Sequence, residues 1–392
     1  MSSPSTHPGA NQLRSAAMGL HIVTGGTGFV GSAVILELLR STDAHVVGLT
    51  RPGKLGAWPR LQQTLEHAAR LYGYGSSLDG DIASRCEAVA ADVCEPSCGI
   101  APSPEWAGAE LWHCAASLQF LDRFEQQIFR TNVNGSRHVA QLAVAAKVET
   151  LNMVSTAYVA GTRAGVIEER AVDSDLAQTN NHYERSKIAA EAVITQAKLP
   201  RVRVLRPGIV IGHSQTHAAL NYNGLYGFLR GIHKFRRLME RTQRELGDRI
   251  EVRMIVDPKG TLNLIPVDHV ALDAVALARA NAGPGYYHLT ATHAPASIPA
   301  LEVIFGSVGM RPPIIVDSRE SFTWLDEKFN SRVDFYSAYL VGPKQFSREQ
   351  INRHLPASPS LEFEIDPAKL AEFCRWYVDG VLTHRKPMPV TR

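Results

Sequence analysis

Tyr183 and Lys187 stand four positions apart in the segment YERSK, which has a helical pattern. This spacing places both side chains on one face of a helix. A nearby ammonium group favours the phenolate, so we expect Lys187 to lower the pKa of Tyr183 and to ease proton transfer at neutral pH. Thr156 ends an apolar strand earlier in the chain. A hydroxyl, a phenol and an ammonium that converge at a sheet edge can polarise and protonate a carbonyl group, which makes these three residues the candidate catalytic set.

In the segment 24–31, TGGTGFVG, three of the four glycines, Gly25, Gly28 and Gly31, are each separated from the next by two residues. In a dinucleotide-binding loop the first glycine allows a tight turn, the second lets the backbone approach the pyrophosphate, and the third lets helix and strand pack closely. An ordinary turn is the alternative for a glycine cluster alone. Here the segment follows an apolar strand and opens an amphipathic helix, whose N-terminal N–H groups attract phosphate. This context predicts cofactor contacts from Thr24, Gly25, Thr27, Gly28, Phe29, Val30 and Gly31.

The end of the second predicted strand discriminates between NAD and NADP. Sites for NAD place a carboxylate there for the ribose 2′-hydroxyl, whereas sites for NADP place an arginine near the 2′-phosphate. The chain has Arg51 and no carboxylate at this point, and Arg60 follows in the next helical segment. A solvated side chain is the alternative for Arg51, but the pattern favours NADPH. Asp92 and Val93, which close the third strand, are predicted to meet the adenine, with a helix cap or a turn as the alternative for Asp92.

The order of the predicted elements supplies a sheet edge on which these residues can meet. Strands and helices alternate between residues 19 and 212. Such alternation is typical of βαβ units and predicts an α/β fold with a doubly wound parallel sheet of the Rossmann type. Ligands then bind at the carboxyl ends of the strands. We expect strands at 19–24, 44–50, 86–93, 109–116, 149–156 and 201–212, and helices at 32–41, 57–72, 131–148 and 183–198.

The pattern changes after residue 212, where we expect a second part of the chain to begin. The expected organisation is a disordered tail at 1–18, an NADP-binding Rossmann domain at 19–212 and a smaller, interleaved substrate-binding lobe at 213–392. Within that lobe, 213–260 is predicted to be long and helical, and 261–281 to return to the Rossmann core. From residue 283 we expect irregular structure, followed by a final helix at 367–382.

The composition argues against several classes of protein. The 392 residues are 45% hydrophobic and 20% charged, with a net charge of +3, which is typical of a globular chain and not of a nucleic-acid binder. Five cysteines are an odd number and argue against a disulfide framework. The pairs Cys94 and Cys98, and His213 and His217, lack the further ligands of a metal site, so no metal is predicted. The sequence has no long apolar run and no signal peptide, and we expect a cytoplasmic protein without a membrane span.

Seven segments together resemble the extended short-chain dehydrogenase/reductases. They are the glycine loop, HCAAS (113–117), TNVNG (131–135), VSTAYVAG (154–161), YERSK (183–187), LRPGIVIG (205–212) and NLIPVDHVA (263–271). They follow the family's order between residues 19 and 290. VSTAYV, the Arg-Pro after the second strand and NLIPVDHVA are most similar to fatty acyl-CoA reductases and thioester-reductase domains, whereas sugar epimerases usually show SSxxVYG.

The resemblance implies roles for individual residues. Thr156 matches the family's active-site serine or threonine, Tyr183 its acid and Lys187 its lysine, while Asn132 matches the asparagine that supports the active-site helix. Cofactor contacts are implied for Tyr183, Lys187, Ala115, Ala116, Pro207 and Gly208, the last two against the nicotinamide. The chain departs from the reductases after GIVIG, where HSQTH (213–217) replaces a short acidic or Thr-Gly stretch.

The reaction that the resemblance implies is the NADPH-dependent reduction of an acyl thioester to an aldehyde, with further reduction to the alcohol left open. The thioester would be an acyl-CoA or an acyl-carrier protein. An NAD(P)-dependent epimerase, a dehydratase or a hydroxysteroid-type dehydrogenase is the alternative, as is a non-catalytic dinucleotide-binding scaffold. The sequence predicts neither the acyl chain nor the oligomeric state.

The segment 230–249 carries seven lysine and arginine residues against three acidic residues. A solvated helix is the ordinary interpretation of such a charge run. The alternative is a surface, including Arg236, Arg237 and Arg241, that attracts the phosphates of coenzyme A or an acidic carrier protein. In that case the thioester would enter along 213–260.

Overall fold

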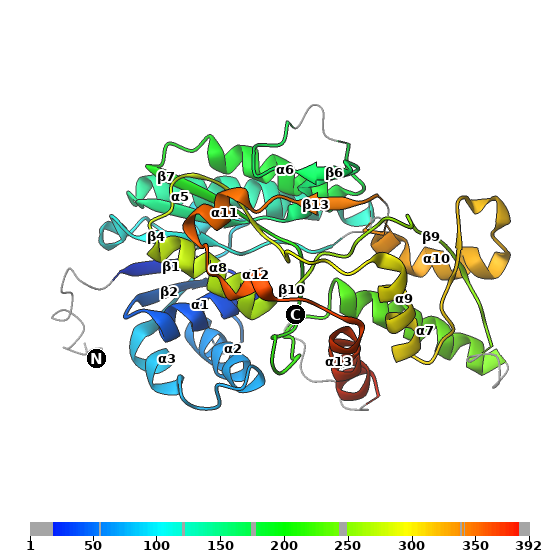
Figure 1. The fold of residues 1–392 in the computed structure, drawn as a ribbon. Coiled ribbons are helices and arrows are strands. Elements are labelled where there is room, and N and C mark those ends of the chain that lie inside the picture. Colours follow the sequence, from blue (N-terminus) through cyan, green and yellow to red (C-terminus); the bar gives the residue numbers. More distant parts are fainter. Residues whose placement is uncertain are drawn as a thin grey trace.

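A seven-stranded parallel sheet forms the centre of the computed structural model (Figure 1), in the order β11-β7-β5-β4-β1-β2-β3. The structure describes residues 19–383 except 55, 120–121, 174–177, 243–248, 338 and 341, so the predicted tail at 1–18 lies outside the described residues. The strands of this sheet are β1 (Leu20–Thr24), β2 (His45–Thr50), β3 (Cys86–Ala90), β4 (Glu110–His113), β5 (Thr150–Val154), β7 (Arg201–Pro207) and β11 (Gly285–Leu289).

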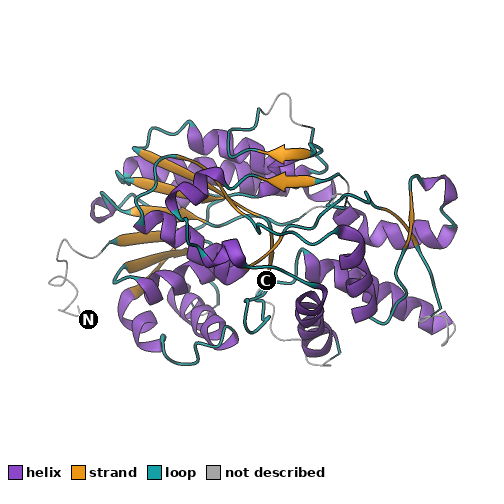
Figure 2. Cartoon of the chain, viewed as in Figure 1, coloured by secondary structure: helices purple, strands orange, loops and turns teal. Residues whose placement is uncertain are grey.

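Successive side chains of each strand point to opposite faces of the sheet and build two separate cores. Ile22 is level with Val47 and Leu111 in the register, and these three pack on one face against α5 and α6. Val23 and Trp112 face the other way, toward α1, α2 and α8. Figure 2 shows helices covering both faces, which confirms the predicted α/β class with a doubly wound parallel sheet. The helices of this unit are α1 (Phe29–Ser41), α2 (Ala57–Leu71), α3 (Asp79–Arg85), α4 (Glu125–Phe129), α5 (Gly135–Ala145), α6 (His182–Thr195) and α8 (Val267–Arg279).

A smaller lobe lies beside the sheet and has its own apolar core (Figure 1). The amphipathic helix α7 crosses this core and buries Leu229, Ile232 and Phe235. Three short two-stranded sheets, β8 with β10, β9 with β12 and β6 with β13, lie outside the main sheet. The remaining elements are α7 (Leu225–Thr242), α9 (Ser297–Ser307), α10 (Trp324–Ser337), α11 (Glu349–His354), α12 (Pro359–Glu362), α13 (Pro367–Tyr377), β6 (Gly165–Ile167), β8 (Ile209–Ile211), β9 (Arg253–Ile255), β10 (Leu264–Pro266), β12 (Ile314–Val316) and β13 (Lys344–Phe346).

Two stretches differ from the expected pattern. Residues 212–224 form turns and loop, not helix, because Asn221 accepts the backbone N–H of Asn223 (3.0 Å) and Gly224 has φ +53°. The chain after residue 283 is not irregular throughout, since β11 pairs with β7 as the edge strand of the main sheet. Pro284 and Gly285 indicate a turn in the sequence, although Gly285 is the first residue of β11. The strand was not predicted because it forms by pairing with β7, which is distant in sequence. In the described part of the chain, no helix is both long and apolar enough to cross a membrane.

Candidate active site

The glycine loop turns sharply between β1 and α1. Gly25 has φ +71°, and a Cβ atom there would lie 2.6 Å from the backbone nitrogen of Ala115. A Cβ atom at Gly31 would lie 2.2 Å from the carbonyl oxygen of Gly25. The N–H of Gly28 donates to that same oxygen (2.8 Å) and closes the turn. Only glycine fits this geometry, which leaves bare backbone at the N-terminus of α1.

The two arginines predicted to bind the 2′-phosphate lie together beyond the carboxyl end of β2. Arg60, at the start of α2, donates from Nη1 to the carbonyl oxygen of Arg51 (2.9 Å). Partial burial and the charge of Arg51 lower the pKa of the Arg60 guanidinium. The Arg51 side chain is exposed. Two cations at this edge of the sheet suit a dianionic phosphate group.

Asp92 and Val93 are engaged within the turn that follows β3. The Asp92 carboxylate accepts the backbone N–H of Cys94 (2.9 Å), which is the turn role that the sequence left open. The Val93 side chain packs beside Gly135 at the start of α5, where a Cβ atom would lie 3.2 Å from Val93 Cγ2. These contacts fix the turn next to the glycine loop.

A buried chain of hydrogen bonds joins the end of β1, directly before the glycine loop, to β4 and α5. The Ser136 hydroxyl donates to the carbonyl oxygen of Asn132 (2.6 Å), so it accepts from His113 Nε2 (3.0 Å). His113 Nδ1 then accepts from the Thr24 hydroxyl (2.9 Å), which in turn accepts the N–H of Ala115 (3.3 Å). Burial lowers the pKa of His113 to about 3, and the charge of Lys187 adds to this effect. His113 is therefore neutral and structural. Sequence reasoning gave it no role, although the HCAAS motif contains it.

Asn132 connects three segments around the site. It lies in a π-helical turn, Arg130–Asn134, which widens the helix between α4 and α5. Its Oδ1 accepts the N–H of Ser117 (2.7 Å), and its Nδ2 donates to the Ser117 carbonyl (3.1 Å) and to Ser186 Oγ (2.9 Å). Ser186 donates to the carbonyl oxygen of Tyr183 (2.7 Å). Asn132 thus holds the segment after β4 against the first turns of α6.

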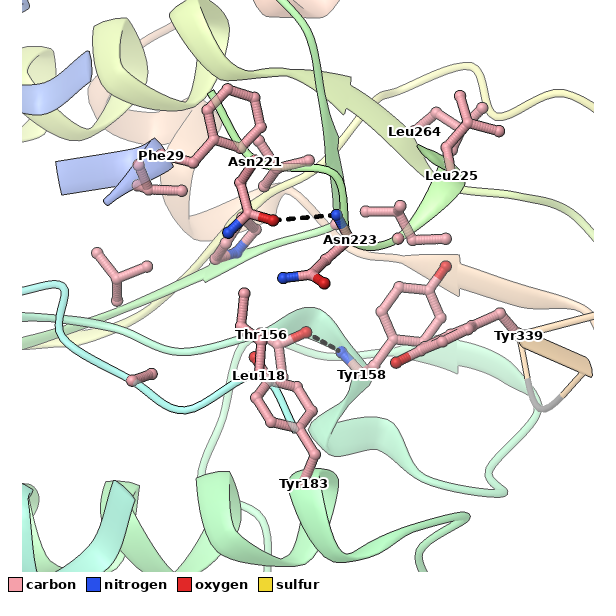
Figure 3. A pocket seen from close by; sticks show the side chains of 18 of the residues that line it. Phe29, Leu118, Thr156, Tyr158, Tyr183, Asn221, Asn223, Leu225, Leu264 and Tyr339 are labelled. Atoms are coloured by element: carbon pink, nitrogen blue, oxygen red, sulfur yellow. Dashed lines mark hydrogen bonds between the residues drawn. The ribbon is translucent and has the colours of Figure 1, made fainter. Parts of the chain in front are cut away.

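Thr156, Tyr183 and Lys187 line one cavity. Figure 3 shows the Tyr183 ring directed from α6 toward Thr156, at the carboxyl end of β5. The Thr156 Oγ1 accepts the N–H of Tyr158 (3.2 Å), so its own O–H can donate to a bound carbonyl group. Lys187 Nζ donates to the carbonyl oxygen of Val154 (2.8 Å), which fixes the ammonium at the strand end.

The pKa of Tyr183 is shifted in the opposite direction from the one expected from the sequence. Burial, reinforced by the nearby Glu184, raises the pKa of Tyr183. Burial also lowers the pKa of Lys187 to about 8. Both side chains are removed from water, and this desolvation disfavours the phenolate as well as the ammonium. The expected lowering of the tyrosine pKa by its lysine neighbour is therefore wrong for this structure, and Tyr183 holds its proton at neutral pH.

The cavity has a volume of about 260 Å³ and extends from the glycine loop into the second lobe. Residues predicted to bind the cofactor that line it are Gly28, Phe29, Val30, Gly31, Ala116, Tyr183, Lys187, Pro207 and Gly208. Thr24, Gly25, Thr27 and Ala115 are not part of the lining. Thr24 is fully buried beneath the loop, so it positions the backbone and does not face the cavity.

Further lining residues come from segments to which the sequence gave no site. Figure 3 shows Asn221 and Asn223 across the cavity from Thr156, with Leu225, Leu264 and Tyr339 grouped to one side. The Asn-Gly pair at 223–224 is a turn signal that could have drawn attention to the segment before α7, and Leu264 lies within the NLIPVDHVA motif. Neither signal predicts that these segments lie next to the main sheet, because their position there depends on long-range packing.

Gly208 allows one such approach. A Cβ atom at Gly208 would lie 2.4 Å from Asn263 Oδ1. The Asn263 carboxamide makes paired hydrogen bonds with the backbone of Ala291, from Nδ2 to the carbonyl and from the N–H to Oδ1, each 3.0 Å long. Asn263 thereby fastens the segment before β10 to the segment after β11, with its side chain against Gly208.

The histidines after β8 and the basic helix have structural contacts. His213 stacks on Tyr72 with ring centroids 5.3 Å apart. His217 lies beside Glu372, with Nε2 3.4 Å from Oε2. Among the described residues, no group of three histidine, cysteine, aspartate or glutamate side chains could hold a metal ion. In α7, Arg236 donates from Nη1 to the carbonyl oxygen of Val308 (2.6 Å), so it joins two helices of the lobe. Its charge is paired with Glu240, with Nε 2.9 Å from Oε1.

Comparison with known proteins places this site in a family. The family model described as Male sterility protein, an NAD-binding family, matches residues 23–274. The L-2-aminoadipate reductase large subunit of Eremothecium gossypii is 25% identical over 283 residues, which are 67% of this chain and 19% of that protein. The fatty acyl-CoA reductase wat of Drosophila melanogaster is 26% identical over 224 residues, 48% of this chain and 42% of that protein. The chain therefore spans about a fifth of the length of the aminoadipate reductase subunit and under half of the length of the fatty acyl-CoA reductase.

The fold is shared with a solved structure, the terminal R domain from the myxalamid PKS-NRPS biosynthetic pathway. The two chains superpose with a TM-score of 0.73 at 22% sequence identity, and the match covers 95% of this chain and 93% of that one. The family match covers more than half of the chain and includes the glycine loop and the helix of Tyr183 and Lys187. The chain therefore belongs to the Male sterility protein family of NAD-binding proteins, with the extended short-chain dehydrogenase/reductase fold.

Proposed function

We propose that the chain is an NADPH-dependent reductase that converts an acyl thioester, carried by coenzyme A or by a carrier protein, into an aldehyde. The observation that carries this proposal is the single cavity in which Thr156, Tyr183 and Lys187 meet the glycine loop at one side and an apolar lining at the other. The names of the relatives, an aminoadipate reductase and a fatty acyl-CoA reductase, support the same class of reaction.

The residues present fit a nicotinamide dinucleotide. The bare backbone at Gly28 and Gly31 leaves room for a pyrophosphate at the N-terminus of α1. Arg51 and Arg60 would hold the 2′-phosphate, which favours NADPH. Asp92 and Val93 would lie near the adenine, and Ala115, Ala116, Pro207 and Gly208 near the remainder of the dinucleotide. When bound, the reduced nicotinamide supplies a hydride to the thioester carbonyl carbon.

The side chains of the cavity would stabilise the negative charge that develops on the substrate and supply a proton to it. Negative charge develops on the carbonyl oxygen, and the hydroxyls of Thr156 and Tyr183 donate hydrogen bonds to it. Tyr183 then supplies its proton, which burial has kept on the phenol. Lys187, fixed by the Val154 carbonyl, holds a positive charge beside Tyr183 and would contact the nicotinamide ribose of a bound cofactor. Protonation of the oxygen gives a hemithioacetal. Its C–S bond then breaks, its hydroxyl proton passes to the departing sulfur to give the free thiol, and the aldehyde remains.

A panel of substrates tests the proposal. We expect purified protein to oxidise NADPH with acyl-CoAs or with matched acyl-carrier proteins, and to release free thiol and aldehyde. Nucleotide sugars and hydroxysteroids serve as the competing substrates, because an epimerase or a steroid dehydrogenase is the alternative function. Turnover of these substrates without any turnover of thioesters would replace the proposal with that alternative.

The cofactor preference is tested separately at Arg51. Replacing Arg51 with glutamate puts a carboxylate where the 2′-phosphate would bind. We expect the KM for NADPH to rise and the preference over NADH to narrow or reverse. Equal use of NADH and NADPH by the unaltered protein would contradict the assignment of Arg51 and Arg60.

A further inference from the structure

We propose that the acyl group of the substrate is an uncharged, apolar chain that enters the second lobe, and that Tyr336 sets the length of chain that is accepted. This inference rests on the proposed thioester reduction and deepens it, since it names the substrate class. It depends on three observations: the charges of the cavity lining, the elements that form its apolar side, and the packing that places Tyr336 there.

The charges of the lining argue against a charged acyl group. Of the described residues that line the cavity, Lys187 alone has a charged side chain, and it is fixed by its hydrogen bond to the Val154 carbonyl. On the apolar side of the cavity, an ammonium or a carboxylate of the acyl chain would therefore be removed from water with no oppositely charged side chain beside it, which is unfavourable. A 2-aminoadipyl group carries both charges. The apolar lining thus separates this chain from the aminoadipate reductase that it resembles.

The apolar side of the cavity is built by helices of the second lobe. Figure 3 shows Leu225, Leu264 and Tyr339 on one side of the cavity and Phe29, at the glycine loop, on the other. A carbonyl group held by Thr156 would thus have the cofactor loop on one side and this apolar group on the other. The apolar and aromatic residues that this lobe contributes to the lining are Leu225 and Phe228 from α7, Ile304 from α9, Tyr336 from α10, Leu264 from β10, and Leu262, Tyr339 and Leu340 from the connecting segments. Asn221, Asn223 and Gly224, just before α7, also line the cavity.

Tyr336 reaches the cavity because two glycines let α10 lie close to α7. A Cβ atom at Gly227 would lie 1.9 Å from Tyr336 Oη, and one at Gly231 would lie 3.0 Å from Val333 Cγ1. The Tyr336 ring packs against Phe228 with centroids 5.5 Å apart. The ring therefore occupies space that three helices, α7, α9 and α10, would otherwise leave to the substrate. Its removal enlarges the cavity on the apolar side.

A series of saturated acyl-CoAs of increasing length tests the role of Tyr336. In the unaltered protein we expect kcat/KM to rise by about fourfold per added methylene, because burial of one methylene group gives a factor of this size. Once the acyl chain fills the cavity, kcat/KM should fall with further length. Tyr336→Ala should move the maximum to longer chains, and Tyr336→Leu should move it less in the same direction. Trp324→Ala is the matched control, because Trp324 lies on the same helix and is 70% exposed. An unchanged maximum in the Tyr336→Leu enzyme overturns the assignment.

A comparison of two acyl-CoAs tests whether the cavity disfavours a charged acyl group. Heptanoyl-CoA and adipoyl-CoA have acyl groups of similar length, but the second ends in a carboxylate. We expect kcat/KM for adipoyl-CoA to be lower by at least about a hundredfold, because the carboxylate would be desolvated without a partner. Equal rates for the two overturn the inference.

Binding separates the failure of this inference from the failure of the proposed function. Alkyl thioether analogues of the acyl-CoAs cannot be reduced, and their affinity can be measured by calorimetry. A protein that reduces no thioester refutes the proposed function. The inference is then decided by binding alone: affinity that increases with alkyl length and responds to Tyr336→Leu supports it, and affinity independent of length overturns it.

Discussion

Tyr183 and Lys187 are both buried, and burial acts on them in opposite directions. It raises the pKa of the phenol and lowers the pKa of the ammonium to about 8. At neutral pH the pair is therefore a neutral phenol beside a cation that is close to losing its proton. A carboxylic thioester that accepts a hydride needs a proton donor, and a buried neutral phenol is one. The pair thus has the ionisation that a reductase needs before any substrate binds.

Replacing Tyr183 with phenylalanine removes the proton donor and little else. We expect kcat to fall by about a hundredfold to ten-thousandfold, the usual contribution of a general acid. Binding of NADPH should persist, measured by the fluorescence of the bound nicotinamide, because the ring and the helix are retained. A Tyr183→Phe enzyme with nearly normal kcat would remove this phenol from the reaction.

The pKa of Lys187 predicts a pH dependence. The folded protein holds Lys187 as a cation below pH of about 8 and as a neutral amine above it. If the cation supports the cofactor and the phenol, kcat/KM should decline as the pH rises through about 8. Lys187→Arg keeps the charge to much higher pH, so its remaining activity should lack this decline. The same decline in the arginine variant would assign it to another group.

Local motifs predicted some residues of the site and not others. Thr156, Tyr183 and Lys187 were found because a strand end and a helical spacing of four determine their relative positions. Asn223 lies outside every motif, and an aromatic residue such as Tyr336 is by sequence alone more often part of a core than of a pocket, so neither was assigned to the site. The approach of Tyr336 to the cavity depends on α7 and α10 packing against each other at Gly227 and Gly231. No short stretch of sequence contains that information.

At the scale of elements, the turn between β1 and α1 leaves no room for a side chain at Gly31. A methyl group at Gly31 would meet the carbonyl oxygen of Gly25 at 2.2 Å. Gly31→Ala should therefore lower the free energy of unfolding by about 1–3 kcal/mol, as overpacking usually does, and weaken dinucleotide binding. Gly80→Ala is the control, since Gly80 lies in the exposed first turn of α3 with nothing within 4 Å.

Chemical denaturation and fluorescence titration measure the two effects. The Gly80→Ala control should be as stable as the unaltered protein or more stable by up to about 1 kcal/mol, because alanine is a better helix former than glycine. If Gly31→Ala behaves like Gly80→Ala in both measurements, the loop has more room than the structure indicates.

The strands of the first unit were predictable, and the edge strand was not. Strands such as β1 and β5 are short apolar runs bounded by turn residues, and their pattern shows in the sequence alone. The segment Gly285–Leu289 includes the buried polar His288, whose N–H donates to Glu169 Oε1 (2.7 Å). This strand depends on β7 and on Glu169, both distant in sequence, so its pattern alone did not reveal it.

At the scale of the whole molecule, the chain returns to its first unit after building the second. Asp273 of α8 is fully buried and paired with Arg348, with Nη2 3.4 Å from Oδ2. It also accepts hydrogen bonds from Ser358 and Ser360. These contacts fasten the segment before α13 onto the helix that packs against α1. The two parts of the chain are therefore joined by buried polar contacts as well as by the backbone.

The surface charge of α7 makes a prediction at this scale. Arg236 is occupied by the Val308 carbonyl, but Arg237 and Arg241 are exposed. If they attract the phosphates of coenzyme A, the double change Arg237→Glu and Arg241→Glu should lower kcat/KM for an acyl-CoA more at low salt than at high salt. The matching N-acetylcysteamine thioester has no phosphates and should be almost unaffected. An equal loss for both substrates would show that the helix matters for packing and not for steering.

We propose that a hydride passes to the carbonyl carbon of a thioester in the cavity of Thr156, Tyr183 and Lys187. The most direct measurement is the reaction of an acyl-CoA with NADPH that carries deuterium at the transferable position, followed by mass spectrometry of the product and titration of the free thiol. We predict an aldehyde, or an alcohol derived from it, with deuterium on the former thioester carbon. Free coenzyme A should form in equal amount to the acyl product, and Tyr183→Phe should abolish both. Acyl-CoA that remains intact while the protein oxidises or reduces another substrate would contradict the claim.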